Sequence, residues 1–315
     1  MSAMKVIFFG SGAFGLPTLK ALAREHRVLG IVSQPDRPAG RGGQLTPTPI
    51  VEFAEREMRG VPILRPEDVN VPAVVSEIRE LGAEAAVVIA FGQKLTPEVL
   101  PGAGRAINLH ASLLPRWRGA APINAAILAG DTVTGNSVIT IAPRMDAGLV
   151  LAQSRLEINP LETAGELHDR LSEQGPGLIM SVLSHIQSGS AGGHQQDEAL
   201  VTKARKLSKK DAWVDFHGSA EECRRRVHGL NPWPGVVVRF REDPLKLLRV
   251  RALPKPGRGE PGTITSATEG FVACGDGLVQ LLEVQPAGGK RLAWPEFARG
   301  KRVSDGELLM GGAQP

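Results

Sequence analysis

Residues 4–33 have the sequence MKVIFFGSGAFGLPTLKALAREHRVLGIVS. An apolar run of strand length leads into a glycine-rich turn, which is followed by apolar residues at helical spacing and then by a second apolar run. A strand, a helix and a second strand in this order predict a βαβ unit. Such units build parallel sheets, so the opening of the chain already favours an α/β fold.

The same alternation continues through the first 190 or so residues. We expect strands at Lys5–Phe9, Val28–Ser33, Ala85–Ala90, Arg105–Leu109 and Ser137–Ile141, and helices at Pro17–His26, Pro49–Met58, Pro72–Leu81 and Thr163–Ile186. Strands such as AAVVIA are apolar without alternation, as expected when helices cover both faces of a sheet. Three of the four helices open with a proline, which suits the first helical turn. The predicted fold class is therefore α/β with a mostly parallel sheet.

The pattern changes near residue 190. The stretch QSGSAGGHQQDEAL, residues 187–200, is rich in Gly, Ser and Gln, and we interpret it as an exposed connection. After it, a helix is expected at Ser219–His228, followed by short strands at Gly235–Arg241, Leu245–Arg251, Gly262–Thr265, Gly270–Ala273 and Val279–Val284. Their even spacing predicts a small antiparallel β domain, for which a barrel is one possible form. We expect domains at 1–190 and 209–315, joined by a linker at 191–208.

Composition excludes several classes of protein. A chain of 315 residues favours two cores, and no apolar run approaches the ~20 residues needed to span a bilayer, so we expect a cytoplasmic protein without a membrane partner. The two cysteines, Cys223 and Cys274, lie far apart in the chain and predict neither a disulfide framework nor a zinc site. The net charge of +4 resides in residues 207–315, which hold 17 basic and 13 acidic residues. This bias alone is weak support for binding RNA.

Gly10, Gly12 and Gly15 spell G-x-G-x-x-G between the first strand and the first helix. A dinucleotide-binding fingerprint also needs an acidic residue about 20 positions later, at the end of the second strand. That strand ends instead in Ser33 and Gln34. We therefore interpret the glycines as a tight strand-to-helix turn. Binding of an anion at the start of the helix remains an alternative.

The strongest chemical signal is AINLHASLLPRWRGAAPI, residues 106–123, which begins as a strand and continues as a polar loop. Asn108 and His110 are two residues apart, so an extended backbone projects both side chains to the same side. A histidine at a strand end is on its own more often structural than catalytic. A second polar loop, PRMDAGLVLAQ, follows the strand SVITIA and places Asp146 at another strand end.

The N-x-H of Asn108 and His110 and the M-D-x-G of residues 145–148 resemble the 10-formyltetrahydrofolate-dependent formyltransferase family. Longer stretches resemble the branch of that family that acts on methionyl-tRNA: QPDRPAGRG at 34–42, SLLPRWRGAAPI at 112–123, NPWPG at 231–235, and residues 284–290. The resemblance extends over nearly the whole chain. It implies a Rossmann-like formyltransferase domain followed by a C-terminal barrel of the oligonucleotide-binding (OB) type.

The resemblance implies transfer of the formyl group of 10-formyltetrahydrofolate to the α-amine of methionine on initiator methionyl-tRNA, for translation initiation. We expect a monomer that uses the folate as co-substrate and no metal. Two alternatives are considered: the same chemistry on a glycinamide ribonucleotide or an amino sugar, and an RNA-binding protein that retains an inactive enzyme fold. The RPAGRG loop and the basic carboxy-terminal region argue against the first alternative, and the intact Asn108, His110 and Asp146 argue against the second.

By analogy with the family, Asn108 donates its amide hydrogens to the developing oxyanion, and a protonated His110 reinforces it. Asp146 would keep His110 charged and relay the proton. The resemblance also implies folate contacts at Ser112, Leu113, Leu114 and Pro115, with the pterin near Phe91 and Gly92. The chain departs from the family at Phe91, where a tyrosine is usual, and at Gln93 and Lys94, which replace apolar residues.

For tRNA, the resemblance assigns the loop 33–49, with Arg37 and Arg41, to the acceptor end. A basic run, KARKLSKK, supplies Lys203, Lys206 and Lys209 for contacts with phosphates. Arg116 and Arg118 could orient either the anionic folate tail or the acceptor strand. The chain has no tyrosine, so we expect recognition by shape and backbone more than by stacking on bases.

Overall fold

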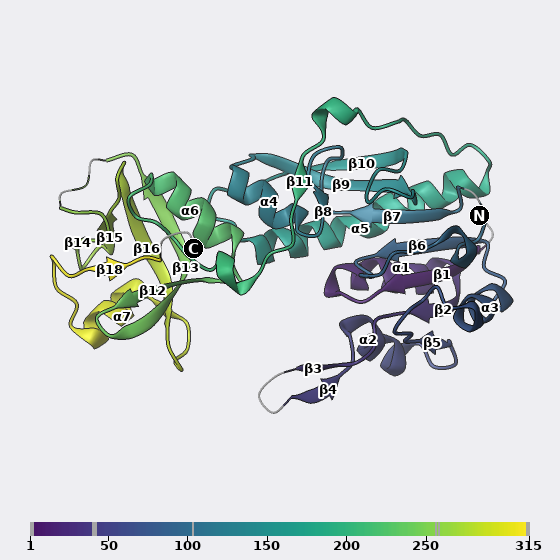
Figure 1. Cartoon of the computed structure of the whole chain (residues 1–315), viewed down its shortest axis with the longest axis horizontal. Coiled ribbons are helices and arrows are strands. Elements are labelled where there is room, and N and C mark those ends of the chain that lie inside the picture. Colours follow the sequence, from purple (N-terminus) through teal and green to yellow (C-terminus); the bar gives the residue numbers. More distant parts are fainter. Residues whose placement is uncertain (1–2, 40–42, 103, 256, 258, 313–315) are drawn as a thin grey trace. The chain divides into compact units, whose positions relative to one another are not determined.

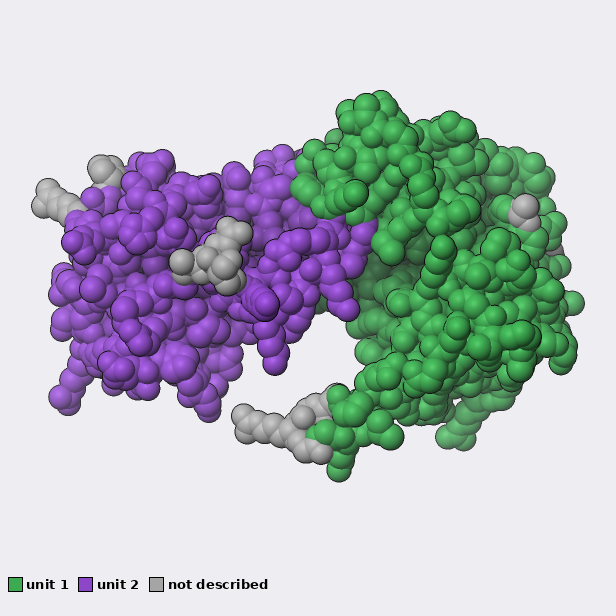
Figure 2. Space-filling model, in the orientation of Figure 1, with its two compact units in different colours: residues 1–118, 135–156, 168–203 green, residues 119–134, 157–167, 204–315 purple. Residues whose placement is uncertain are grey.

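The computed structural model describes residues 3–39, 43–102, 104–255, 257 and 259–312. The chain forms two compact units, coloured separately in Figure 2. Unit 1 comprises residues 1–118, 135–156 and 168–203, and unit 2 comprises residues 119–134, 157–167 and 204–315. The boundary at 203/204 falls inside the predicted linker 191–208, whereas residues 119–134 and 157–167, expected in the first domain, group with the carboxy-terminal part of the chain.

Unit 1 is built on one seven-stranded sheet (Figure 1). Its strands lie in the order β10 (Val150–Glu157), β9 (Val133–Thr140), β7 (Ala106–His110), β6 (Ala85–Ile89), β1 (Lys5–Gly10), β2 (Arg27–Val32) and β5 (Ile63–Leu64). The pairs from β7 to β5 are parallel, whereas β7 and β9 are antiparallel. The predicted α/β class with a mostly parallel sheet is confirmed.

Helices α1 (Leu16–Glu25), α2 (Pro49–Glu57) and α3 (Pro72–Glu80) connect strands of this sheet, and each has a proline in its first turn. Helix α5 (Ala164–Gln187) follows β10, the last strand of the sheet in the chain. Strand β6 is buried along its whole length. On β7 the side chains alternate between the two faces of the sheet. Ala106 belongs to the apolar cluster that contains Val75 and Ile78 of α3, whereas Leu109 faces Gly175 of α5. Asn108 and His110 therefore share the Ala106 face.

The glycines after β1 are explained by close packing. A Cβ atom at Gly10 would lie 2.5 Å from Phe8 Cε1 and 2.9 Å from the Ile89 carbonyl oxygen, and one at Gly15 would lie 3.0 Å from Phe8 Cζ. The turn thus needs residues without side chains where it passes β6. This agrees with the interpretation of the motif as a tight strand-to-helix turn.

Unit 2 contains a nearly closed antiparallel barrel. Its strands lie in the order β14 (Ile264–Ser266), β15 (Phe271–Ala273), β16 (Leu278–Pro286), β13 (Asp243–Leu253), β12 (Val236–Phe240) and β18 (Leu309–Met310), and β17 (Leu292–Ala293) pairs with β16. Next to β14 and β18, Thr263 and Leu308 form an antiparallel bridge that joins the two ends of the sheet. The predicted carboxy-terminal β-barrel is therefore confirmed.

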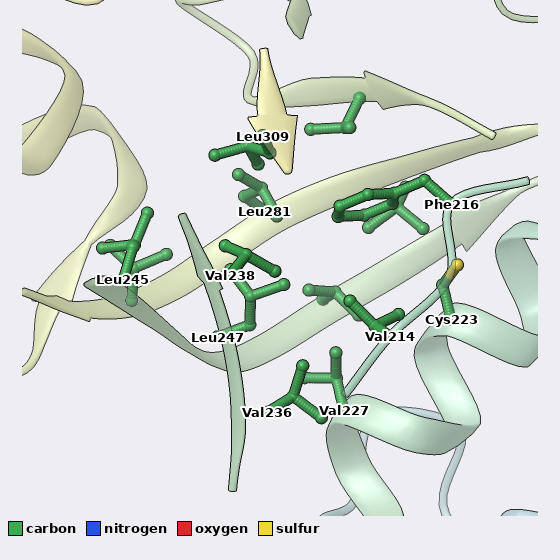
Figure 3. Packing of buried hydrophobic residues seen from close by; sticks show 14 of the residues in the cluster. Val214, Phe216, Cys223, Val227, Val236, Val238, Leu245, Leu247, Leu281 and Leu309 are labelled. Carbon is green, nitrogen blue, oxygen red and sulfur yellow. The ribbon is translucent and has the colours of Figure 1, made fainter. Parts of the chain in front are cut away.

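Helices α4 (Pro122–Ala129), α6 (Ala220–Gly229) and α7 (Trp294–Lys301) complete unit 2. Cys223 and Val227 of α6 point toward barrel residues such as Val236 and Leu281 in a shared core (Figure 3). Trp294 is fully buried, and its indole nitrogen donates to the Ala267 carbonyl oxygen at 2.7 Å. No helix in the described part of the chain combines the length and the apolar character needed to cross a membrane.

His228, in the last turn of α6, is a buried polar residue in this core. Its Nε2 atom accepts a hydrogen bond from the Val250 amide at 3.1 Å, and its Nδ1 atom has no hydrogen-bond partner within the described residues. Burial is the largest cause that lowers the pKa of His228, to about 4, and the guanidinium groups of Arg224 and Arg249 lower it further. The folded state therefore favours the neutral ring.

We predict that His228 makes the protein sensitive to mild acid. Between pH 6.5 and 4 the unfolded state binds a proton that the folded state excludes, so stability falls as the pH drops through this window. At pH 5 the loss relative to pH 7.5 is about 2 kcal/mol. Urea unfolding at both pH values measures it. His228→Gln can still accept from Val250 and should lose less stability on acidification; an equal loss in both proteins contradicts the assignment.

Candidate active site

The end of strand β7 and a loop of unit 1 bring His110 and Asp146 together. His110 is the last residue of β7, and Asp146 lies between β9 and β10. The antiparallel register pairs Ile107 with Thr140, so β9 ends beside the start of β7. The loop that follows must therefore fold back along β7 for Asp146 to reach His110. The two side chains meet with 3.7 Å between His110 Nδ1 and Asp146 Oδ1, and both are largely buried.

The imidazole of His110 is oriented by a backbone group. Its Nε2 atom lies 2.9 Å from the carbonyl oxygen of Trp117. A carbonyl oxygen can only accept, so Nε2 carries a hydrogen and donates it. Nδ1 is then the nitrogen that faces Asp146. This arrangement fixes which ring atom is available for proton exchange with the carboxylate.

Asn108 lies on the same face of β7, between Val88 of β6 and Ile139 of β9. It is half-buried. Among the residues that the structure describes, none forms a hydrogen bond with its side-chain amide. The amide hydrogens therefore remain available for a bound substrate near His110.

The loop after β7 is held by buried hydroxyl groups. Ser137 Oγ donates to the Ser112 carbonyl oxygen at 2.6 Å and accepts from the Leu114 amide at 3.0 Å, and Gln153 Nε2 donates to the Leu114 carbonyl oxygen at 2.9 Å. Ser112 and Leu114 are buried, so of the four predicted folate-contact residues in this loop, Leu113 and Pro115 offer the accessible surface. Ser112 Oγ donates to the Arg116 carbonyl oxygen at 2.6 Å.

Phe91 lies next to the carboxyl end of β6, but its side chain points into the core. It is 2% exposed and packs edge-to-face on Phe9, with 5.6 Å between ring centroids. Its carbonyl oxygen accepts from Ser11 Oγ and Gln34 Nε2. Gly92 is exposed and has a φ of +85°, a conformation that favours glycine. A folate contact here would come from Gly92 and the backbone instead of the Phe91 ring.

The segment expected to be an exposed connection contributes directly to the site. Gln196 Nε2 donates to the carbonyl oxygens of Asp146 and Gly148 at 2.7 and 2.8 Å. Thr202 accepts from the Trp117 amide through Oγ1 at 2.8 Å and from the Arg118 amide through its carbonyl oxygen at 2.9 Å. Neither residue was predicted, because Gln196 lies in a Gly-, Ser- and Gln-rich stretch and Thr202 just beyond it, and the composition there carries no signal for such contacts.

Arg118 is buried, and its three guanidinium nitrogens donate to Gln196 and Glu198. These hydrogen bonds, with those from Arg144, lower the pKa of the Glu198 carboxyl group. The guanidinium group is therefore engaged within unit 1 and is not poised for a folate tail or an RNA strand. Arg116 is exposed and lies over the Trp117 ring, 5.0 Å from its centroid.

Four of the five residues predicted to contact tRNA lie in the described part of the chain, and all four are exposed. Arg37 is on β3 (Arg37–Ala39), which forms a hairpin with β4 (Gln44–Thr46), and it pairs with Glu67 at 3.0 Å. Arg41 lies outside the described residues. Lys203, in unit 1, and Lys206 and Lys209, in unit 2, are exposed.

Backbone strain accompanies the site. Ala90, Trp117 and Asp146 have φ angles of +48°, +63° and +53°, values that non-glycine residues adopt at a cost. Trp117 supplies the carbonyl oxygen that orients His110, and Asp146 is the partner of His110. Across the ranges that the structure describes, no group of three or more His, Cys, Asp or Glu side chains could hold a metal ion.

Comparison with known families accounts for this geometry. Residues 4–183 match the model of the formyl transferase family, and residues 206–302 match its C-terminal domain. The chain belongs to the formyl transferase family. It is 41% identical over 309 residues to a methionyl-tRNA formyltransferase of Symbiobacterium thermophilum, a match that covers 96% of this chain and 94% of the relative. A methionyl-tRNA formyltransferase of Geotalea daltonii is 40% identical, with 97% and 98% covered.

Solved structures show the same fold at low identity. HypX from Aquifex aeolicus in complex with tetrahydrofolic acid matches with a TM-score of 0.63 at 15% identity, over 94% of this chain and 47% of that one. The sugar 3N-formyl transferase WlaRD matches with a TM-score of 0.67 at 14% identity, over 90% and 99%. The Rossmann-like formyltransferase fold expected from the sequence is confirmed.

Gly148 provides a test of how the Asp146 loop is held. A Cβ atom at this position would lie 1.7 Å from the Thr140 carbonyl oxygen, so we predict that Gly148→Ala displaces the loop. The free energy of unfolding should fall by about 1–3 kcal/mol, as in other overpacked sites. Urea unfolding measures this change.

Gly177→Ala is the matched control. Gly177 lies on α5 with nothing within 4 Å of its virtual Cβ, so the alanine should be neutral or stabilise the protein by about 0.5–1 kcal/mol. If the free energy of unfolding of Gly148→Ala equals that of Gly177→Ala, the Asp146 loop tolerates the movement.

Proposed function

We propose that this protein transfers the formyl group of 10-formyltetrahydrofolate to the α-amine of methionine on initiator methionyl-tRNA. The observation that carries the proposal is the His110–Asp146 pair beside the unengaged amide of Asn108, in a chain that matches both formyl transferase models. Relatives named methionyl-tRNA formyltransferase align over almost their full length with this chain.

The reaction exchanges one carbon–nitrogen bond for another. The amine attacks the formyl carbon, a tetrahedral oxyanion forms, and the bond from that carbon to N10 of the folate breaks. The amine loses a proton and N10 gains one. In this scheme Asn108 donates its amide hydrogens to the oxyanion, and loss of one such donor costs on the order of 10² to 10³ in rate.

His110 and Asp146 would transfer the proton that the amine loses and N10 gains. Because Nε2 of His110 donates to the Trp117 carbonyl oxygen, the exchanging proton is carried on Nδ1, on the side of Asp146. The separation of 3.7 Å is longer than a hydrogen bond, so in this scheme proton exchange requires a closer approach of the two groups or a bridging water. A protonated ring beside the carboxylate also adds positive charge near the oxyanion.

Folate and tRNA would bind on residues already placed by the fold. Leu113 and Pro115 offer apolar surface for the folate ring, and Gly92 allows close approach to its backbone. Arg37 on the β3–β4 hairpin and the exposed lysines suit phosphate contacts. Each chain holds every group used here, so we propose that the protein acts as a monomer. We also propose that it acts in the cytosol.

The direct test combines the protein with 10-formyltetrahydrofolate and methionyl-tRNA, initiator or elongator, and follows formylmethionine. We expect product with initiator tRNA. Asn108→Ala should lower kcat at least about a hundredfold, and His110→Ala and Asp146→Ala should lower it as well.

Each alternative outcome has a distinct meaning. No product with initiator tRNA rejects the proposed acceptor, and formylation of a small amine such as an amino sugar would identify another branch of the family. Tight RNA binding without turnover would indicate an inactive enzyme fold. Near-normal kcat in the three alanine variants, with unchanged circular dichroism, would contradict the catalytic roles.

The basic run makes a separate prediction. Replacing Lys206 and Lys209 together by alanine should raise KM for tRNA and leave kcat with saturating tRNA near wild type. It should also reduce the slope of log affinity against log salt by about 1 for each phosphate that the variant no longer neutralises. Filter binding from low to moderate salt measures the slope. Lys5→Ala, an exposed lysine on β1, is the control and should leave the slope unchanged.

A further inference from the structure

The segment 194–202 contacts the loop that carries Asp146 and the loop after β7, which supplies the carbonyl partner of His110. We propose that Gln196 and Thr202 are positioning residues that set the separation between His110 and Asp146. The proposal rests on the function proposed above for that pair. All the residues involved belong to unit 1.

Gln196 holds the backbone at Asp146 and at Gly148, two positions later. One NH₂ group donates to the carbonyl oxygens of residues 146 and 148, and the Oε1 atom accepts from Arg118 Nε at 2.9 Å. Carbonyl oxygens only accept and a guanidinium group only donates, so these three partners allow a single orientation of the amide. Gln196 thus connects the Asp146 loop to the loop that follows β7.

This restraint acts where the backbone needs one. Asp146 has a φ of +53°, a strained conformation that a non-glycine residue keeps only where the surrounding structure imposes it. The two hydrogen bonds from Gln196 span the strained residue and the glycine two positions later. Without these two hydrogen bonds, we expect the strained loop to relax and Asp146 to move away from His110.

Thr202 fixes the other half of the pair. Its Oγ1 and carbonyl oxygen accept from the amides of Trp117 and Arg118, and the carbonyl oxygen of Trp117 accepts from His110 Nε2. Trp117 also has a positive φ, of +63°. The short segment from Gln196 to Thr202 therefore holds both the Asp146 backbone and the carbonyl partner of His110.

Glu198 lies between them and adds a weaker link. Its carboxylate accepts from Arg118 and from Arg144, which lies on the Asp146 loop. The Glu198 side chain is 54% exposed, so these ion pairs are screened by solvent and contribute little. Of the two side chains, Gln196 is therefore the stronger restraint on the Asp146 loop.

The first experiment measures formyl transfer with Gln196→Ala, Gln196→Glu and the neighbouring Gln195→Ala. Gln195 is exposed and serves as the control. A misplacement of about 1 Å in a reacting group can cost around a hundredfold, so we expect kcat to fall about 10- to 100-fold in both Gln196 variants, with KM for both substrates within about threefold. Glutamate keeps the size and the contact with Arg118 but cannot donate to two carbonyl oxygens.

Thr202 gives a matched pair. Thr202→Val removes the acceptor for the Trp117 amide at constant shape, whereas Thr202→Ser keeps the hydroxyl group. We expect the valine variant to lose kcat like Gln196→Ala and the serine variant to stay within about twofold of wild type. If one Thr202 variant has an altered melting temperature, its kcat is compared with that of the other. This comparison separates loss of the hydroxyl group from loss of stability.

The second readout does not depend on activity. Proteins labelled with ¹⁵N-histidine report the ring nitrogens of His110, assigned by their loss in His110→Ala. We expect these signals to move in Gln196→Ala and Thr202→Val and to stay in place in Gln195→Ala. If the wild type formylates no methionyl-tRNA but the signals move, the proposed function fails and the positioning role stands. Unchanged His110 signals in Gln196→Ala and Gln196→Glu, or kcat within about twofold of wild type, overturn the positioning role.

Discussion

The hydrogen bond from His110 Nε2 to the Trp117 carbonyl oxygen is the constraint on which the candidate site depends. His110 is buried, so its ring cannot exchange this partner for water without cost. The bond selects one nitrogen for the carbonyl oxygen and leaves the other for Asp146. The loop after β7, the strained residue Trp117 and the segment near Thr202 all serve to keep that carbonyl oxygen in place.

Much of the sheet and barrel could be predicted because the signals are local. Apolar runs such as residues 85–89 and prolines in the first helical turn define their elements within one or two residues. Strand β10 escaped prediction because it is a sheet edge with many partly exposed residues, and α4 because its sequence continues a loop of polar and basic residues. Local pattern does not distinguish such segments from irregular chain.

The candidate site was predictable to a different degree at each residue. Asn108 and His110 share a face because strand geometry has a period of two. The approach of Asp146 could not be derived from strand order, because β9 runs antiparallel to β7 and its carboxyl end lies beside Ile107. Gln196 and Thr202 act through contacts with loops that are distant in the sequence. Composition does not reveal these contacts and predicts only a flexible connection for the segment that contains the two residues.

The placement of α4 in unit 2 has a consequence for how the chain is made. Asn124 of α4 donates to the carbonyl oxygen of Gly229 at the end of α6, at 2.7 Å, and Leu128 packs against the core that α6 shares with the barrel. A ribosome therefore completes α4 long before it completes α6. Until α6 has been synthesised, α4 lacks these contacts, so its packing in unit 2 is completed only after residue 229 has been made.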